Sequence, residues 1–233
     1  MQSAVGVSKR LLLPALLYID SDMTRSSLNL EIEIKLQLGS FMNYLKLVGF
    51  LGSIDAEETQ LNGYYDTEDR RLARAGWALR VRCLDDGGQM TLKGVASPRG
   101  TAMIREELEG VIPRQTALDL LNLTREVLGI EAPPVAFVKK EFPGATLARL
   151  VKFNNIRQKK RFKIGDYFYT FEIDKTQFAD GSVDYELEVE LDEAGRVEEV
   201  QDSLRKLFTS LDIPFIPQEK SKYERALAHA RLI

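Results

Sequence analysis

Charged residues recur at every second position along several segments of this chain. Glu31, Glu33 and Lys35 alternate with isoleucine, and the same period of two is seen elsewhere, in Arg80 and Arg82; Arg105, Glu107 and Glu109; Arg157, Lys159 and Arg161; Glu172 and Asp174; and Glu186, Glu188 and Glu190. Residues two apart in a β-strand point to the same face. Each segment is therefore expected to be a strand with one charged and one apolar face.

The kind of charge on these strands suggests a binding site rather than a solvated surface. A half-buried antiparallel strand can simply turn its charges to water. A row of like charges is nonetheless unfavourable unless an opposite charge lies beside it, and Glu186, Glu188 and Glu190 form such a row. Carboxylate oxygens suit Mg²⁺ or Mn²⁺, while arginine and lysine bind phosphate oxygens. The pattern predicts a charged lumen that holds a metal and a polyanion.

Several other kinds of chemistry are excluded by composition. Cys83 is the only cysteine and His229 the only histidine, so intrachain disulfides and histidine-rich zinc sites are excluded. We interpret His229 as a surface residue of the last helix. The sequence has no GxxxxGK[ST] loop, and its net charge of −3 is unlike that of a dedicated nucleic-acid binder. Phosphoryl transfer needs mainly positioning and charge neutralisation, which carboxylates, lysines and arginines can supply.

Strands joined by hairpins dominate the expected secondary structure. A turn at 85–88 joins two of the strands, and helical periodicity follows a serine at position 40. These elements predict an α+β domain with a barrel or a strongly curved sheet at its centre. The expected strands are 28–38, 61–66, 78–84, 89–94, 103–111, 137–142, 156–164, 168–175 and 183–191; the expected helices are 40–50, 116–128, 146–151, 193–211 and 221–232.

The chain is expected to divide into an N-terminal extension, residues 1–27, and a single domain, residues 28–233. The apolar run 11–19 is interrupted by Pro14 and is too short to span a membrane. Residues 1–27 are interpreted as a flexible extension or an organelle-targeting segment. Without targeting, the expected location is the cytoplasm, since a lone cysteine suits a reducing compartment.

The charged segments also occur in an order that resembles a known family. Glu31-Ile-Glu-Ile-Lys35 resembles the ExExK signature of the CYTH superfamily, the triphosphate tunnel metalloenzymes, and the match looks closest to stand-alone plant and bacterial inorganic triphosphatases. Its companions follow in family order across residues 29–225: Tyr64-Tyr-Asp-Thr67, Leu79-Arg-Val-Arg82, Thr91-Leu-Lys93, Arg105-Glu-Glu-Leu-Glu109, Arg157-Gln-Lys-Lys-Arg161, Phe171-Glu-Ile-Asp174, Tyr185-Glu-Leu-Glu188 and Lys220-Ser-Lys-Tyr223.

This resemblance implies an eight-stranded antiparallel barrel, surrounded by helices, that hydrolyses tripolyphosphate to pyrophosphate and phosphate with Mg²⁺ or Mn²⁺. Thiamine triphosphate, a nucleoside triphosphate and an RNA 5′-triphosphate are alternative substrates. Adenylate cyclase activity and non-catalytic polyphosphate binding are alternative functions. We expect a small-molecule substrate, no requirement for nucleic acid, no membrane association, and a monomer or weak dimer.

The resemblance also implies roles for individual residues. Glu31, Glu33 and Lys222 are expected to be catalytic, and Lys222 would close the tunnel from the last helix. The expected metal ligands are Glu31, Glu33, Glu107, Glu109, Glu172, Asp174, Glu186 and Glu188. The expected substrate-binding residues are Lys35, Arg80, Arg82, Lys93, Arg105, Arg157, Lys159, Arg161 and Lys222.

Overall fold

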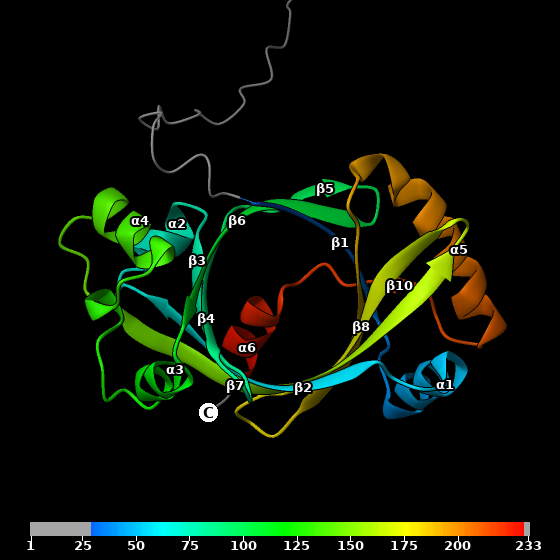
Figure 1. The fold of residues 1–233 in the computed structure, drawn as a ribbon, viewed down its shortest axis with the longest axis horizontal. Coiled ribbons are helices and arrows are strands. Elements are labelled where there is room, and N and C mark those ends of the chain that lie inside the picture. The colour runs from blue at the N-terminus through cyan, green and yellow to red at the C-terminus, as the bar shows by residue number, and fades with distance from the viewer. Residues whose placement is uncertain (1–28, 231–233) are drawn as a thin grey trace, which may run out of the picture.

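Eight antiparallel strands form a closed barrel in the computed structural model, which describes residues 29–230 (Figure 1). The predicted α+β fold with an eight-stranded antiparallel barrel is therefore confirmed, and the predictions for residues 1–27 lie outside the described residues. Around the ring the strands are β1 (Asn29–Gln37), β9 (Val183–Glu190), β8 (Tyr167–Gln177), β7 (Ala148–Ile164), β2 (Ala56–Asp66), β3 (Ala78–Cys83), β4 (Gly88–Lys93) and β6 (Ala102–Ile112), which pairs back with β1. Two short strands, β5 (Ser97–Arg99) and β10 (Ile216–Pro217), extend β6 and β1.

The strand register brings charged residues from different strands opposite one another. Glu31 pairs with Arg105 across β1 and β6, and Lys35 pairs with Glu188 across β1 and β9. On β1 and β9 the alternate residues Ile32, Ile34, Leu36, Leu187 and Val189 are apolar and buried, and they face outward from the barrel. The barrel therefore reverses the usual arrangement, with a polar interior and an apolar exterior that must be covered.

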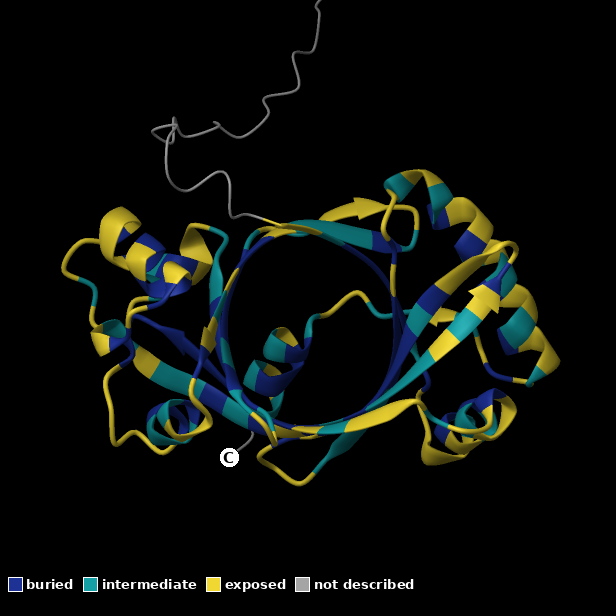
Figure 2. Cartoon of the chain, in the orientation of Figure 1, coloured by how far each residue is buried: buried dark blue, intermediate teal, exposed yellow. Residues whose placement is uncertain are grey.

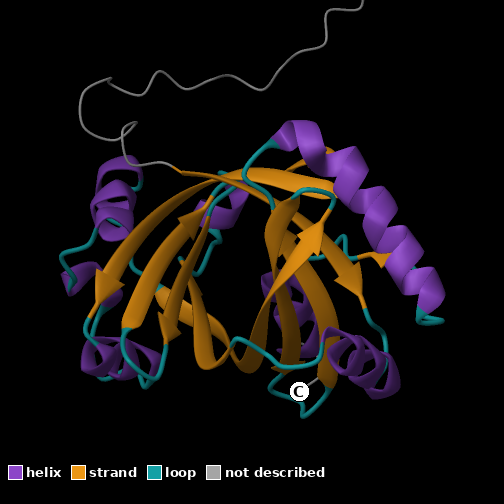
Figure 3. Cartoon of the chain, turned by 45° about the vertical axis from the view of Figure 1, so that its right-hand side comes forward, coloured by secondary structure: helices purple, strands orange, loops and turns teal. Residues whose placement is uncertain are grey.

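Helices cover this apolar exterior on two sides (Figure 3). On one side, α1 (Phe41–Leu51) and α5 (Val197–Ser210) pack on β1, β8 and β9, and the α5 residues Val200, Leu204 and Phe208 have no exposed surface. On the other side, α2 (Arg71–Arg74), α3 (Arg114–Leu121) and α4 (Pro133–Glu141) pack on β3, β4 and β6. Figure 2 shows that the barrel wall between these layers is mostly buried. No helix in the described part of the chain is long and apolar enough to cross a membrane.

The last helix, α6 (Lys222–Ala230), lies against one end of the barrel (Figure 1). Its Tyr223 ring stacks on Tyr64 of β2, with 4.5 Å between ring centroids, and Ala226 is buried in the same small apolar cluster as Phe153 and Phe178. These contacts fix the beginning of α6, where Lys222 is located.

Two predicted elements were wrong. Residues 137–142, predicted as a strand, belong to helix α4, because Pro134 occupies its first turn and Val135 and Val138 form its buried face. Residues 146–151, predicted as a helix, include the beginning of β7, where Val151 pairs with Tyr64.

The boundaries of two predicted helices also differ. The predicted helix 116–128 ends at Leu121, and Leu123 then adopts a positive φ of 62° before a short 3₁₀ turn, η2 (Val127–Gly129). The predicted helix 193–211 comprises η3 (Ala194–Arg196) followed by α5.

Candidate active site

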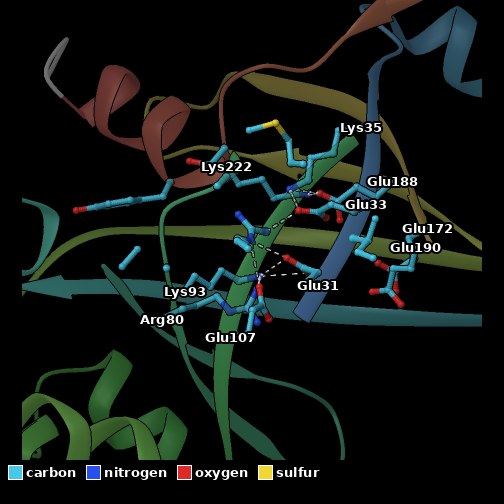
Figure 4. Close-up of a pocket in the computed structure, with 18 of the residues that line it drawn as sticks. Glu31, Glu33, Lys35, Arg80, Lys93, Glu107, Glu172, Glu188, Glu190 and Lys222 are labelled. Carbon is cyan, nitrogen blue, oxygen red and sulfur yellow. Dashed lines mark hydrogen bonds and ion pairs between the residues drawn. The ribbon is translucent and has the colours of Figure 1, made fainter. Parts of the chain in front are cut away.

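The barrel encloses a cavity of about 980 Å³ whose wall carries most of the predicted site residues. Acids and bases from opposite parts of the ring turn into this same space, among them Glu31, Glu188, Arg80 and Lys93 (Figure 4). The lining includes Glu31, Glu33, Lys35, Arg80, Arg82, Lys93, Arg105, Glu107, Glu109, Arg157, Lys159, Glu172, Glu188 and Lys222.

Three predicted site residues do not line the cavity. Asp174 and Glu186 are buried beneath Lys222, with which both form ion pairs. Arg161 is exposed, and its guanidinium lies 4.5 Å from the centroid of the Phe168 ring on the same hairpin. The expectation that Arg161 faces the lumen with Arg157 and Lys159 is therefore wrong, because β7 is 17 residues long and extends beyond the cavity at that point.

Asp174, Glu186 and Glu188 form a buried carboxylate cluster. Asp174 on β8 pairs with Glu186 on β9, and each of the three residues offers an oxygen within 4.8 Å of the others. Three carboxylates this close repel one another unless cations lie among them. Hard oxygen donors at this spacing fit a divalent ion such as Mg²⁺ or Mn²⁺. The donor set therefore matches the metal that the sequence predicts.

Cationic side chains of the protein neutralise this cluster. Lys222 Nζ lies 2.7 Å from Asp174 Oδ2 and 2.9 Å from Glu188 Oε1, and it also contacts Glu186. Arg157 Nη2 lies 2.6 Å from Asp174 Oδ2, and the same guanidinium contacts Glu188. Burial alone would raise the pKa of the Glu188 carboxyl, but Lys222, Lys35 and Arg157 hold it well below the usual range.

A second group of acids surrounds Arg105. Its Nε and Nη2 atoms lie 2.6 Å from Glu31 Oε2 and from Glu33 Oε1 respectively, and Lys93 contacts Glu31 and Glu107. Lys35 connects this group to the carboxylate cluster, since its Nζ is 2.9 Å from Glu33 and 3.1 Å from Glu188. Glu31 and Glu33 thus lie close to the cluster, but their role as metal ligands stays a prediction.

Arg80 and Arg82 differ from the other cations of the cavity. Arg80 Nη2 donates to Thr91 Oγ1 at 2.9 Å and Arg82 Nε donates to Asn62 Oδ1 at 2.8 Å, but no carboxylate of residues 29–230 forms a salt bridge with either side chain. The Nε of Arg80 is buried without a hydrogen-bond partner in the described structure. Burial, together with Arg80 and Arg157, lowers the pKa of Arg82 to about 9. A buried guanidinium at Arg80 beside a half-buried one at Arg82, neither paired with an acid of the described residues, forms a site for an anion.

Sequence reasoning assigned no site role to three charged residues of this region. Arg225, three residues after Lys222 on α6, lies 2.7 Å from Glu186, and Glu58 lies 2.7 Å from Lys159. Glu190 lines the cavity mouth. The signal for Glu190 was present, because it continues the alternation of Glu186 and Glu188. Arg225 could have been inferred from helical spacing, since residues three apart share a helix face.

Glu190 gives a test of the electrostatics at the cavity mouth. Burial and the carboxylates of Glu172 and Glu31 raise the pKa of Glu190 to about 7. Ionised Glu190 is therefore unfavourable in the folded state above pH 7, whereas below about pH 4 the group is protonated in both states. Because Glu190 is partly solvated, we expect Glu190→Gln to raise the free energy of unfolding by only about 1 kcal/mol at about pH 8 and not at all near pH 4.

Urea denaturation in EDTA at several pH values measures this difference. Glu131→Gln, at an exposed position outside the barrel, is the matched control. A gain in stability that is equal at acidic and alkaline pH would contradict the assigned pKa.

Comparisons with known proteins agree with this architecture. The family model for the CYTH domain matches residues 29–226. The adenylyl cyclase candidate HpAC1 from Hippeastrum, a protein reported to have a dominant triphosphatase activity, is 25% identical over 85% of this chain and 95% of its own, with a TM-score of 0.71. An adenylate cyclase candidate from Bacillus halodurans is 21% identical over 85% of this chain and 98% of its own, with a TM-score of 0.66.

A more distant structure shares the fold. The PH1819 protein from Pyrococcus horikoshii is 17% identical over 84% of this chain and 98% of its own, with a TM-score of 0.57. Comparison with curated protein sequences gave no match.

Proposed function

Because this chain belongs to the CYTH domain family, we propose that it is a divalent-metal-dependent hydrolase that cleaves tripolyphosphate into pyrophosphate and phosphate inside its barrel. One observation carries the proposal: the buried Arg80 and the half-buried Arg82, which lack an acidic partner in the described chain, share a cavity with a dense set of carboxylates. The cations suit a phosphate chain, and the carboxylates suit the metal that accompanies it. The triphosphatase activity of the similar HpAC1 protein supports the same reaction class.

The side chains around the cavity divide into those that bind phosphate and those that balance charge. Arg80, which is buried, and Arg82, which is half-buried, bind phosphate oxygens with guanidinium groups that have already lost part of their hydration, and Lys93 lies on the adjacent strand β4. The other cations of the cavity are paired with acids: Lys35, Arg105, Arg157, Lys159 and Lys222. When those acids bind a metal ion, these side chains can pair with an entering phosphate chain instead.

Asp174, Glu186 and Glu188 would hold the metal, with Glu31 and Glu33 nearby. A divalent ion supplies positive charge against the phosphate oxygens and activates water when it is bound. The closed barrel excludes bulk solvent from the phosphate chain, which strengthens every electrostatic contact within it.

An organic triphosphate is a second candidate substrate, because part of the cavity wall is apolar. Trp77, Tyr64 and Tyr223 line the cavity together with Val95, whose side chain is 69% exposed. Tripolyphosphate has no apolar group that packs on such a surface, whereas the ring of a nucleotide or of thiamine does.

A phosphate-release panel tests the proposal directly. We expect release from tripolyphosphate in Mg²⁺ or Mn²⁺, loss of release in EDTA, and recovery when either metal is returned; ATP and thiamine triphosphate tested in parallel rank the substrates. The double variant Glu31→Gln with Glu33→Gln, purified in the same way, controls for contaminating phosphatases. An unchanged rate in that variant, or full activity in EDTA, would refute a metal-dependent reaction in the barrel.

A further inference from the structure

His229 holds the C-terminal end of α6 against the turn between β8 and β9. Its Nδ1 lies 2.7 Å from Asp180 Oδ2 and 3.0 Å from Ser182 Oγ. The imidazole also stacks on the Phe178 ring, with 4.4 Å between centroids and 13° between planes. The only histidine of the chain, with 27% of its side chain exposed, is therefore a contact between two elements at the protein surface.

The same face of α6 carries the groups that enter the carboxylate cluster. Lys222, Arg225 and His229 are spaced at i, i+3 and i+7, so all three point from one side of the helix toward the barrel. Lys222 contacts all three acids of the cluster, and Arg225 contacts Glu186. His229 lies two turns further along, roughly 10 Å from Lys222 along the helix axis.

We infer that His229 is a positioning residue: through α6 it holds Lys222 at the cavity, and its protonation tightens this hold. The inference rests on the proposed function, in which Lys222 binds the phosphate chain. The CYTH domain match ends at residue 226, so His229 lies beyond the part of the chain that the family model covers.

The charges around His229 give the direction of the effect. Hydrogen bonds from Ser182, and then from His229, lower the pKa of Asp180 to about 2, so Asp180 is ionised at any pH near neutrality. Neutral imidazole can share only a hydrogen bond with this carboxylate, whereas imidazolium adds an ion pair. Histidine ordinarily changes charge between about pH 5 and 8. Lower pH within that range should therefore hold α6 more firmly.

The other charged groups near His229 are Asp184, Glu219, Lys220 and Arg225, which line the same surface groove. Asp184 lies 3.0 Å from Arg225, and acids and bases of these types ordinarily change charge near pH 4 and above pH 10. Glu190 does titrate near neutrality, but it lies at the cavity mouth on β9, so a variant at His229 separates the two contributions.

The test compares KM for tripolyphosphate in four proteins: wild type, His229→Gln, Lys222→Ala and the double variant, each at about pH 6 and about pH 8.5 with saturating Mg²⁺. We expect His229→Gln to raise KM about threefold at the lower pH, with little change at the higher pH. In the Lys222→Ala background the same substitution should have no effect on KM. Ala228→Gln, at an exposed neighbouring position of α6, is the control for a glutamine on this helix.

A merely structural role for His229 predicts a different result. It would give a KM ratio that is the same at both pH values, or an effect that persists without Lys222, and either outcome would overturn the inference.

Amide hydrogen exchange over residues 222–230 measures how firmly the His229–Asp180 contact holds α6, and it does not depend on catalysis. We expect faster exchange in His229→Gln than in wild type at about pH 6, and a smaller difference at about pH 8.5. If this difference appears while wild type releases no phosphate with any metal, the proposed function fails but the role of His229 in holding α6 stands. Equal exchange in the two proteins at both pH values would refute the inference even if the enzyme is active.

Discussion

Glu188→Gln is expected to lower kcat/KM for tripolyphosphate about a thousandfold and to destabilise the fold by about 3 kcal/mol. Glu188 is 5% exposed and compensates three cations at once: Lys35, Arg157 and Lys222. Glutamine preserves the shape of the side chain but removes the negative charge, which leaves these buried cations under-compensated. It also removes one of the three carboxylates that suit a divalent ion.

The pH dependence of stability distinguishes this cause from simple mispacking. The cations hold the pKa of Glu188 well below its usual range, so ionised Glu188 stabilises the folded state above about pH 4.5. That stabilisation is lost as the pH falls toward the pKa of the folded state. Wild type and Glu188→Gln should therefore differ most near neutral pH and converge in acid.

Urea denaturation between pH 3 and pH 8, with phosphate-release assays at neutral pH, measures both effects. Glu106→Gln is a matched control, since Glu106 is an exposed glutamate on barrel strand β6. A Glu188→Gln enzyme that retained wild-type activity would exclude Glu188 from the reaction. A loss of stability that did not change with pH would mean that the cations do not depend on its charge.

The alternation of charged and apolar residues was enough to predict the interior of the barrel. A strand with a period of two has only two faces, so assigning Glu31 to the lumen also assigns Glu33 and Lys35. Six such strands required an apolar exterior, and the helices between them could cover it. What alternation leaves undetermined is where a strand leaves the cavity. Arg161 obeys the same period as Arg157 and still lies outside the cavity, because the length of β7 relative to its neighbours is set by pairing.

The two wrong elements have a related physical cause. Residues 137–142 and 146–151 are each six residues long, and six residues do not separate a period of two from a period of 3.6. The pairing of β7 with β2, almost a hundred residues earlier, decided that the second segment extends a strand. Local sequence carries no information about this partner.

The ion-pair pattern within the site was also beyond sequence reasoning. Alternation predicted a charged lumen but not which acid meets which base: Arg105 lies among Glu31, Glu33 and Glu107. Its contacts with Glu31 and Glu33 join residues 74 and 72 positions apart, and they depend on the stagger of the barrel. For the same reason the sequence did not reveal the partner of His229, since Asp180 belongs to a turn 49 residues earlier.

Arg80→Gln is expected to raise KM for tripolyphosphate about a hundredfold while leaving the stability of the ligand-free protein unchanged or slightly higher. Removing a buried charge usually destabilises a protein because its partner is left alone. Arg80 has hydrogen bonds to Thr91 and Gln89 but no acidic partner among residues 29–230, and its charge lies next to that of Arg82. The fold thus bears a desolvation and repulsion cost at Arg80 that only an anion offsets.

Thermal denaturation with and without tripolyphosphate, in the absence of metal, tests this directly. Binding to the folded state raises the melting temperature, so the ligand should stabilise wild type strongly and Arg80→Gln weakly. Arg125→Gln, at an exposed position after α3, should behave like wild type in both conditions. If Arg80→Gln instead lost stability without ligand and kept its response to tripolyphosphate, the guanidinium would be a structural element of the barrel, and the anion site would have to be placed elsewhere in the cavity.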